Sequence, residues 1–243
     1  MPLIPGSAVN VRVVCLGHTH ALSGAVAGLA AGLYLTHQSA AQLALFTGLT
    51  AGAAVLPDID HPNSTLAHCF GFLTKSFAWL VGKISGGHRH LTHAILGVAG
   101  FEGLAWLAVK YSREIGGKAG LVVLLSLLIA SGLYAFGVRG HVADLAAIAA
   151  SIGLVITGTS LSHLATAVGV GCATHVVGDM LTDEGCPLFY PFTEQHYRLL
   201  PRPLAFTTGT RPELWVLDPA LATGLGLLFY HAVQLGMIRI KLH

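Results

Sequence analysis

The stretch LSHLATAVGVGCATHVVGDML, residues 161–181, decides the fold class of this chain. It is apolar over the length that a helix needs to cross a bilayer, about 20 residues. Near its end it carries His175 and Asp179, whose spacing of four residues places both side chains on one face of a helix. An ionisable residue inside a membrane segment costs roughly 2.5–3.5 kcal/mol on insertion scales and is therefore usually functional. We interpret the stretch as a membrane helix that ends in half of a metal site.

The composition extends this interpretation to the whole chain. Hydrophobic residues make up 53% of the 243 residues and charged residues only 10%, whereas about a quarter of an ordinary globular domain is charged. The 13 basic and 11 acidic residues nearly balance, so we expect no nucleic acid partner. The four cysteines form no Cys-x-x-Cys pair, which argues against a thiolate zinc site. We predict an all-α, polytopic helical membrane protein with residues 1–243 in one domain.

Seven apolar segments can be drawn as membrane spans, several of them shorter than usual. They lie at residues 21–37, 40–56, 91–109, 119–137, 142–158, 161–181 and 217–236. Residues 65–84 carry two lysines among apolar residues, so we expect an amphipathic helix lying along the membrane interface. Residues 182–216 are polar, proline-rich and aromatic, which predicts an extramembrane loop or lid.

Small residues repeat every four positions on the first two spans. Gly24, Gly28 and Gly32 do so on the first, and Gly48 and Gly52 on the second. Small residues at this spacing let two membrane helices approach closely. We therefore assign these glycines to helix packing.

Clusters of histidine and aspartate occur at four places where the predicted spans meet the same membrane face. The first cluster precedes span one, the second follows span two, the third opens span three and the fourth ends span six. Together they predict a metal site at that face. The candidate ligands are His20, Asp58, Asp60, His61, His88, His93, His175 and Asp179.

Two of the clusters also have a simpler explanation. Pro57–Pro62 (PDIDHP) is also typical of a polar turn with an aspartate cap, and Gly87–His93 (GHRHLTH) of a basic membrane anchor. His18 and His20 alternate and cannot share a helical face, so we expect only His20 to be a ligand. Because each cluster follows or opens an apolar helix, we favour the metal site. We expect Arg89 to bind an anionic oxygen in bidentate fashion.

Nitrogen and oxygen ligands without paired thiolates favour zinc, with manganese or iron as alternatives. Such an ion lowers the pKa of a bound water to about 7 and so produces hydroxide at neutral pH. Eight candidate ligands exceed the needs of one tetrahedral ion, which indicates two or three ions. We expect Asp60 or Asp183 to serve as the general base.

In this order the motifs resemble those of a known family, the LexA-binding, inner-membrane-associated metal-dependent hydrolases. The resemblance rests on five pieces of the sequence. They are Thr19-His20, Pro57–His61, His88–His93, His175–Gly185 and Pro191-Phe192. It implies an all-helical fold related to zinc phospholipase C and the P1-type nucleases, and hence phosphoester cleavage at a multi-zinc site. The chain departs from the pattern at His90, where a small residue is usual, and at Ala94, where a serine is usual.

We therefore expect a multi-pass hydrolase of the cell inner membrane that contacts membrane lipid and acts on a phospholipid or lipid-linked phosphoester. One alternative is a metal or proton transporter, in which membrane histidines and aspartates form a relay. That alternative predicts ionisable residues throughout the bilayer, whereas here they gather at one face. The other is a scaffold that binds a protein regulator such as LexA and holds a purely structural metal.

Overall fold

The computed structural model describes residues 16–36, 39–205, 207 and 210–238. Regular structure in these residues is helical apart from one isolated β-bridge between Cys186 and Tyr197, so the predicted all-α class is confirmed. The α-helices are α1 (Leu16–Leu35), α2 (Ala40–Ala53), α3 (Phe72–Ile84), α4 (Ile95–Lys110), α5 (Ile115–Ala135), α6 (His141–Ile156), α7 (Leu164–Met180) and α8 (Asp218–Gln234). Short helical turns are η1 (Leu56–Asp60), η2 (Leu66–His68), η3 (Leu91–His93) and η4 (Glu213–Leu217).

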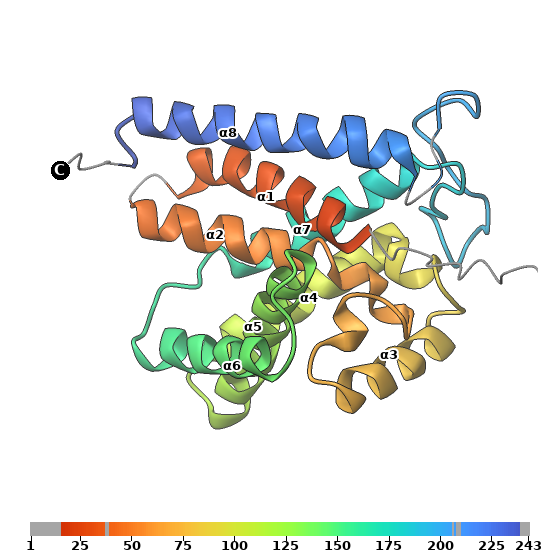
Figure 1. Ribbon diagram of the computed structural model, residues 1–243. Coiled ribbons are helices and arrows are strands. Elements are labelled where there is room, and N and C mark those ends of the chain that lie inside the picture. Colours follow the sequence, from red (N-terminus) through yellow and green to blue (C-terminus); the bar gives the residue numbers. More distant parts are fainter. Residues whose placement is uncertain (1–15, 37–38, 206, 208–209, 239–243) are drawn as a thin grey trace, which may run out of the picture.

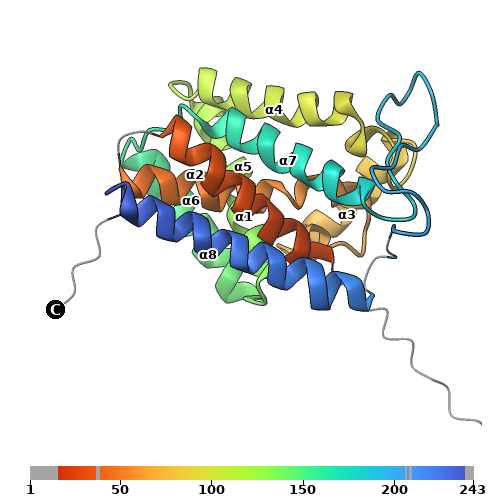
Figure 2. The ribbon, with the colours of Figure 1, turned by 90° about the horizontal axis from the view of Figure 1, so that it is seen from above.

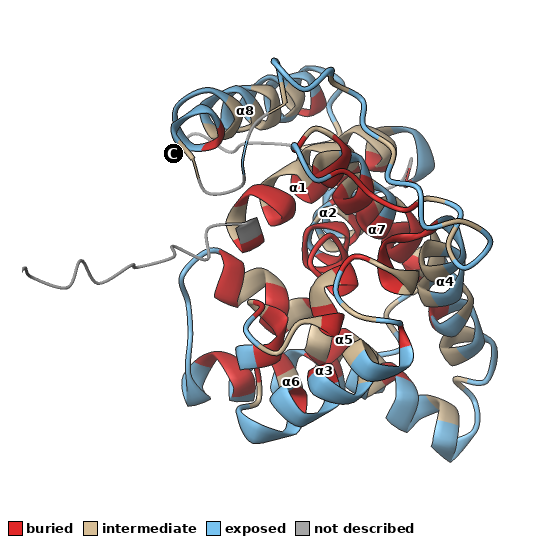
Figure 3. Ribbon diagram, turned by 90° about the vertical axis from the view of Figure 1, so that its right-hand side faces the viewer, coloured by how far each residue is buried: buried red, intermediate tan, exposed pale blue. Residues whose placement is uncertain are grey.

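The bundle is built around α2 and α7. Helix α2 packs against α1, α5 and α7, and α7 packs in addition against α4. Helix α6 lies outside on α5, and α8 runs along the outer side of α1 (Figures 1 and 2). Buried residues concentrate on the surfaces that these helices turn toward one another, while much of α8 is exposed (Figure 3). The packing places the end of α2, the start of α4 and the end of α7 close together.

Glycines make the close contact between α1 and α2 possible. A Cβ added at Gly24 would lie 2.6 Å from the Cβ of Ala54, and one at Gly28 would lie 2.8 Å from the Cβ of Thr50. On the other side of α2, a Cβ at Gly52 would lie 1.9 Å from the carbonyl oxygen of Leu128 in α5. The predicted packing role is therefore confirmed at these positions. It is wrong for Gly48, which has no atom within 4 Å of a built Cβ.

Three helical stretches are long and apolar enough to cross a membrane. They are Ala40–Asp60, Ile115–Ala135 and Glu213–Gln234. Helices α6 and α7 are apolar but shorter, with 16 and 17 residues. At 1.5 Å per residue such helices extend about 25 Å, less than the usual hydrocarbon thickness of about 30 Å. The structure thus identifies three candidate spans, and the seven-span arrangement stays a prediction.

Helix α3 shows the amphipathic character expected for residues 65–84, although it begins only at Phe72. Phe72 and Leu73 are 82% and 75% exposed, and Trp79 and Ile84 are also exposed. The buried side of α3 holds small residues such as Ala78. An exposed apolar surface of this kind is typical of a helix in contact with lipid.

The first turns of the predicted third span are not α-helical. Residues 85–94 form an irregular turn and the 3-10 turn η3, and α4 begins at Ile95 rather than at residue 91. Arg89 has a φ of +57°, which lies in the left-handed region. A non-glycine residue pays about 1–3 kcal/mol for such a conformation, which persists only where its surroundings fix it. The histidine motif, residues 87–93, is therefore a loop of fixed conformation that packs against η1.

The sequence predicts a loop over residues 182–216. In the described part of this range residues 182–205 form turns and irregular structure, whereas residues 213–216 belong to the helical turn η4. The backbones of Cys186 and Tyr197 bond to each other in both directions, and the amide of Leu199 donates to the carbonyl of Met180 at 2.8 Å. The loop lies at the end of the bundle where α7 ends and α8 begins (Figure 1). It therefore covers the same end as the histidine and aspartate clusters.

Candidate metal centre

Seven of the eight predicted ligands come together at one end of the bundle. Helix α1 contributes His20, η1 contributes Asp58 and Asp60, and α7 contributes His175 and Asp179. The loop before α4 contributes His88 and His93. Their candidate ligand atoms form three groups in which all members lie within 4.8 Å of one another. The groups are His20, His175 and Asp179; Asp58, His93 and His175; and Asp60, His88 and His93.

The imidazoles of His93 and His175 turn their Nε2 atoms toward each other at the centre of the site. The Nδ1 of His175 donates to the backbone carbonyl of Ala54 at 2.7 Å. The Nδ1 of His93 lies 2.9 Å from Oγ1 of Thr92, whose hydroxyl donates to Asp60. In the neutral rings the Nε2 atoms therefore carry lone pairs, and these two atoms lie 3.1 Å apart. Metal-bound histidines typically donate their other ring N–H to a carbonyl or carboxylate network in this way.

Two carboxylate oxygens lie at tetrahedral spacing from both of these nitrogens. The Nε2 of His93 lies 3.6 Å from Oδ1 of Asp58 and 3.5 Å from Oδ2 of Asp179. The Nε2 of His175 lies 3.6 and 3.7 Å from the same two oxygens. Ligands about 2.0–2.2 Å from zinc in a tetrahedron lie about 3.3–3.6 Å apart. The two histidines together with either aspartate therefore fit part of a tetrahedral zinc site, and Asp58 and Asp179 belong to different groups of candidate ligand atoms.

His20 adds a further candidate ligand beside these residues. Its ring stacks on that of His175, with centroids 3.8 Å apart. Its Nε2 lies 3.4 Å from Oδ1 of Asp179 and makes no hydrogen bond to any residue that the structure describes. A buried polar nitrogen without a hydrogen bond is costly, and a cation bound there would satisfy it. His18 points away and contacts Asp218 of α8, so only one histidine of this pair reaches the centre, as predicted.

Asp60 holds other groups of the site in place. Its Oδ1 accepts from Nδ1 of His88 at 2.8 Å. Its Oδ2 accepts from the backbone amide of Arg89 at 3.2 Å and from the hydroxyl of Thr92. A carboxylate with both oxygens engaged in this way orients neighbouring ligands more readily than it binds a metal. The predicted roles of Asp60 as metal ligand and general base remain predictions.

Arg89 is buried and bonded to two acids. Its guanidinium contacts Asp179 at 3.1 Å and the exposed Glu184 at 2.9 Å, and it donates to Thr182 at 3.3 Å. Burial would lower the pKa of Arg89, but Asp179 and Glu184 outweigh it, so the pKa lies above its ordinary value. The charged guanidinium therefore fixes the position of Asp179. The predicted contact of Arg89 with an anionic oxygen remains a prediction.

The structure keeps the other predicted residues at the edge of the site. His61 belongs to none of the three groups, although its ring lies 4.9 Å from that of His88. Burial lowers the pKa of His61, and the neighbouring His88 lowers it further. The carboxylate of Asp183 is exposed and accepts from Thr207 at 3.0 Å within the loop. His90 turns its ring toward Tyr190, with centroids 5.2 Å apart, rather than toward the ligands.

Several residues near the centre have no recognisable signal in the sequence. The thiol of Cys186 is buried 3.9 Å from Oδ2 of Asp179, and its burial raises its pKa, which keeps it protonated. Glu213 of η4 is fully buried and lines the cavity that also contains His20. Thr92 and Thr182 lie inside recognised motifs, but their hydrogen bonds to Asp60 and Arg89 depend on the folded loop.

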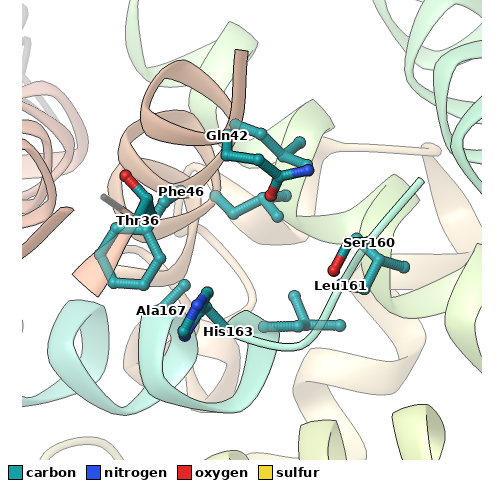
Figure 4. A pocket seen from close by; sticks show the side chains of 10 residues that line it. Thr36, Gln42, Phe46, Ser160, Leu161, His163 and Ala167 are labelled. Carbon is teal, nitrogen blue, oxygen red and sulfur yellow. The ribbon is translucent and has the colours of Figure 1, made fainter. Parts of the chain in front are cut away.

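A small cavity lies at the opposite end of the bundle, between the starts of α2 and α7, and also has a histidine in its wall. Its volume is about 10 Å³, enough for a single water at most. Figure 4 shows His163 beside Ala167 and Phe46 on its wall. The ring of His163 packs edge-on against Phe46 at 6.4 Å. His163 is thus an ordinary packed histidine.

The candidate ligands lie within a segment that a family model matches. The model of the YdjM inner membrane proteins matches residues 16–235, which include all eight α-helices and all eight predicted ligands. The chain belongs to this family. It is therefore an inner membrane protein, which confirms the predicted location, and three of its helical stretches can span the membrane. No curated protein and no solved structure matches the chain.

Proposed function

We propose that this protein is a membrane-bound, metal-dependent hydrolase that cleaves a phosphoester of a lipid or lipid-linked substrate. One observation carries the proposal. The Nε2 atoms of His93 and His175 lie 3.1 Å apart, and one oxygen of Asp58 and one of Asp179 each lie 3.5–3.7 Å from both nitrogens, close to the spacing of ligands on one zinc. The resemblance of the motifs to the LexA-binding metal-dependent hydrolases supports the reaction class.

The ligand chemistry favours zinc, with manganese or iron as alternatives. His20 and His88 offer candidate ligand atoms in addition to those of the four residues above, which supports a second or third ion. Bound ions of this kind act as Lewis acids and activate water at neutral pH. His88 is part-exposed and Asp58 is not fully buried, so water and substrate would reach the centre from their side.

The residues around the ligands would perform separate tasks. Asp60 fixes His88, the backbone of Arg89 and Thr92 through its hydrogen bonds. Arg89 holds Asp179 and supplies the positive charge nearest to it, which would favour an anionic phosphoester. Asp183, exposed on the covering loop, remains the candidate for a general base that moves with that loop.

We further propose that the seven apolar helices α1, α2 and α4–α8 cross the membrane and that α3 lies along its surface. This arrangement puts the metal centre at one membrane face, where a lipid headgroup can reach it. The shorter helices would require a locally thinner bilayer, at a cost of fractions of a kcal/mol per Å. The exposed apolar residues of α3 support its place at the interface.

A hydrolysis assay tests the proposal directly. Purified protein loaded with zinc is incubated with a soluble aryl phosphate, a phosphodiester and a phospholipid, beside the variants Asp58→Ala and Asp179→Ala. The proposal expects hydrolysis that falls to background in both variants and persists in His163→Ala, whose ring lies at the opposite end of the bundle. Unchanged hydrolysis in both aspartate variants would refute it. Bound metal without hydrolysis, together with metal uptake in proteoliposomes, would favour the transporter.

A further inference from the structure

A cavity of about 310 Å³ leads away from the metal centre between α1, α7 and the start of α8. His20 and Asp179, two candidate ligands, form part of its wall. The rest of its wall comes from residues 19–30 of α1, 174–182 at the end of α7 and 213–221 before and within α8. Pockets that bind small molecules have volumes of about 300–1,000 Å³, so this one is large enough for part of a substrate.

The cavity is polar at the metal end and apolar beyond it. His20, Asp179 and Glu213 line the end nearest the centre, while Val26, Ala27, Ala30 and Leu221 line the rest. The hydroxyls along the wall are turned to their own helices, because Ser23 donates to the carbonyl of His20 and Thr174 to that of Val170. The hydroxyl of Thr182 donates to the carbonyl of Asp179 in the same manner. The distal wall therefore offers an apolar ligand nothing but hydrocarbon contact.

The cavity also has the length and the position of a lipid chain. From His20 to Ala30, α1 rises about 15 Å along its axis, and Ala27, Gly178 and Ala30 leave space where larger side chains would fill it. Helix α8 covers α1 from outside, buries only Ala232 and exposes much of its surface (Figure 3), as expected for a helix against lipid. Val177 of α7, at the cavity wall, is half exposed. The space thus lies between the metal centre and the lipid-facing side of the bundle.

Resting on the proposed function, we propose that this cavity binds one hydrocarbon chain of the substrate. The phosphoester lies at His20 and Asp179, and the chain extends along α1 past Ala27 toward Ala30. The substrate class is therefore an amphiphile with a phosphoester at the end of a single extended chain or of one chain of a phospholipid. A soluble phosphoester without such a chain would use the metal centre alone.

Photo-crosslinking tests this binding without relying on catalysis. The full chain, loaded with zinc in detergent, is irradiated with a long-chain alkyl phosphate that carries a diazirine near its methyl end. Mass spectrometry of the digested protein then locates the label. We expect labelling of the segments 26–30 and 217–221, suppressed by an excess of the unlabelled alkyl phosphate. Labelling spread over the exposed faces of α3, α6 and α8, without competition, would refute the proposal.

A matched pair of variants identifies the cavity as the site. Ala27→Phe fills it, whereas Ala173→Phe adds the same ring to an exposed position of α7 that does not line it. We expect Ala27→Phe to lower competed labelling about tenfold, the effect of losing about two buried methylene groups, and Ala173→Phe to leave it unchanged. Metal content is measured in both, because equal zinc in both shows that the centre has formed. Equal labelling in the two variants would refute the proposal.

Labelling and hydrolysis together distinguish chain binding in the cavity from the proposed hydrolase activity. If the cavity is labelled but no phosphoester is hydrolysed, chain binding stands and the hydrolase falls. If both soluble and long-chain phosphoesters are hydrolysed, and Ala27→Phe changes the KM of neither, the hydrolase stands and chain binding falls. If both hold, Ala27→Phe raises the KM of the long-chain substrate about tenfold and leaves the soluble one unchanged.

Discussion

The Nε2 atoms of His93 and His175 lie 3.1 Å apart in a fully buried position, and the Nδ1 atoms of both rings are engaged in hydrogen bonds to Thr92 and to the carbonyl of Ala54. As neutral rings they present two lone pairs to each other. Burial lowers the pKa of His93, but the hydrogen-bonded carboxylates of Asp58 and Asp60 raise it to about 9, so either a proton on His93 or a bound cation joins the two nitrogens. Asp58 and Asp179 add two carboxylate oxygens within 3.7 Å of the same nitrogens. A shared cation would satisfy the two nitrogens together with either carboxylate. The fold thus brings these side chains into an arrangement that calls for positive charge.

The two aspartates of the Pro57–Pro62 segment should differ in their effect on metal binding. Asp58 points to the Nε2 atoms of His93 and His175, whereas Asp60 points to His88, Arg89 and Thr92. We expect Asp58→Asn to abolish binding at the first zinc site. Asp60→Asn should retain it with affinity lowered about 10–100-fold, the usual cost of losing an outer partner. Competition with a zinc-sensitive chelating dye measures both. Equal loss in the two variants would show that Asp60 is a ligand.

Arg89 and Glu184 should contribute unequally to stability. The guanidinium of Arg89 is the buried partner of Asp179, while the side chain of Glu184 is 68% exposed. Removal of one partner from a buried ion pair costs about 3–5 kcal/mol, whereas an exposed pair contributes about 0–1 kcal/mol. We expect Arg89→Ala to lower the melting temperature of the zinc-free protein strongly and Glu184→Ala to change it little. Similar shifts in the two variants would contradict a positioning role for Arg89.

Two glycines of α2 provide a matched test of the packing. A methyl group at Gly52 would collide with the backbone of Leu128, while one at Gly48 meets nothing within 4 Å. We expect Gly52→Ala to destabilise the protein by about 1–3 kcal/mol, as overpacking does. Gly48→Ala should be neutral or stabilising by up to about 1 kcal/mol, because alanine favours a helix over glycine. Thermal unfolding in detergent measures both, and a destabilised Gly48→Ala would contradict the described contact between α2 and α5.

Removal of the metal should destabilise the wild-type protein. A ligand that binds only the folded state adds about 2.7 kcal/mol at a hundred times its dissociation constant. We therefore expect a chelator to lower the melting temperature and zinc to restore it. In Asp179→Ala the melting temperature should be lower at the outset and respond to neither. A chelator effect of equal size in that variant would place the stabilising metal elsewhere.

Much of the fold followed from the pattern of apolar residues. The predicted spans at 40–56, 119–137 and 142–158 overlap α2, α5 and α6 over most of their lengths. Periodicity could not locate the start of α4, because residues 85–94 take their conformation from contacts with Asp60 rather than from their own preference. It also could not distinguish Gly48 from Gly52, since both have the same spacing and only the neighbouring helix differs.

The convergence of the ligands was predictable from counting helix crossings, and their individual roles were not. Sequence spacing favoured His20 over His18, and the structure agrees. Asp58 and Asp60 look equivalent in the sequence, yet the turn η1 directs them to opposite sides of the loop before α4. The burial of Glu213 beside His20 depends on a contact between α8 and α1 that no local pattern indicates.

The most direct test of the metal centre is the metal content of the purified protein, measured by mass spectrometry after purification without chelator and resupply of zinc. Wild type is compared with His175→Ala, and with His163→Ala as the control from the same region of the chain. We expect at least one zinc per chain in wild type and in His163→Ala, and loss of that zinc in His175→Ala. Absence of stoichiometric zinc, manganese or iron from the folded wild-type protein would contradict the metal centre and the hydrolase that rests on it.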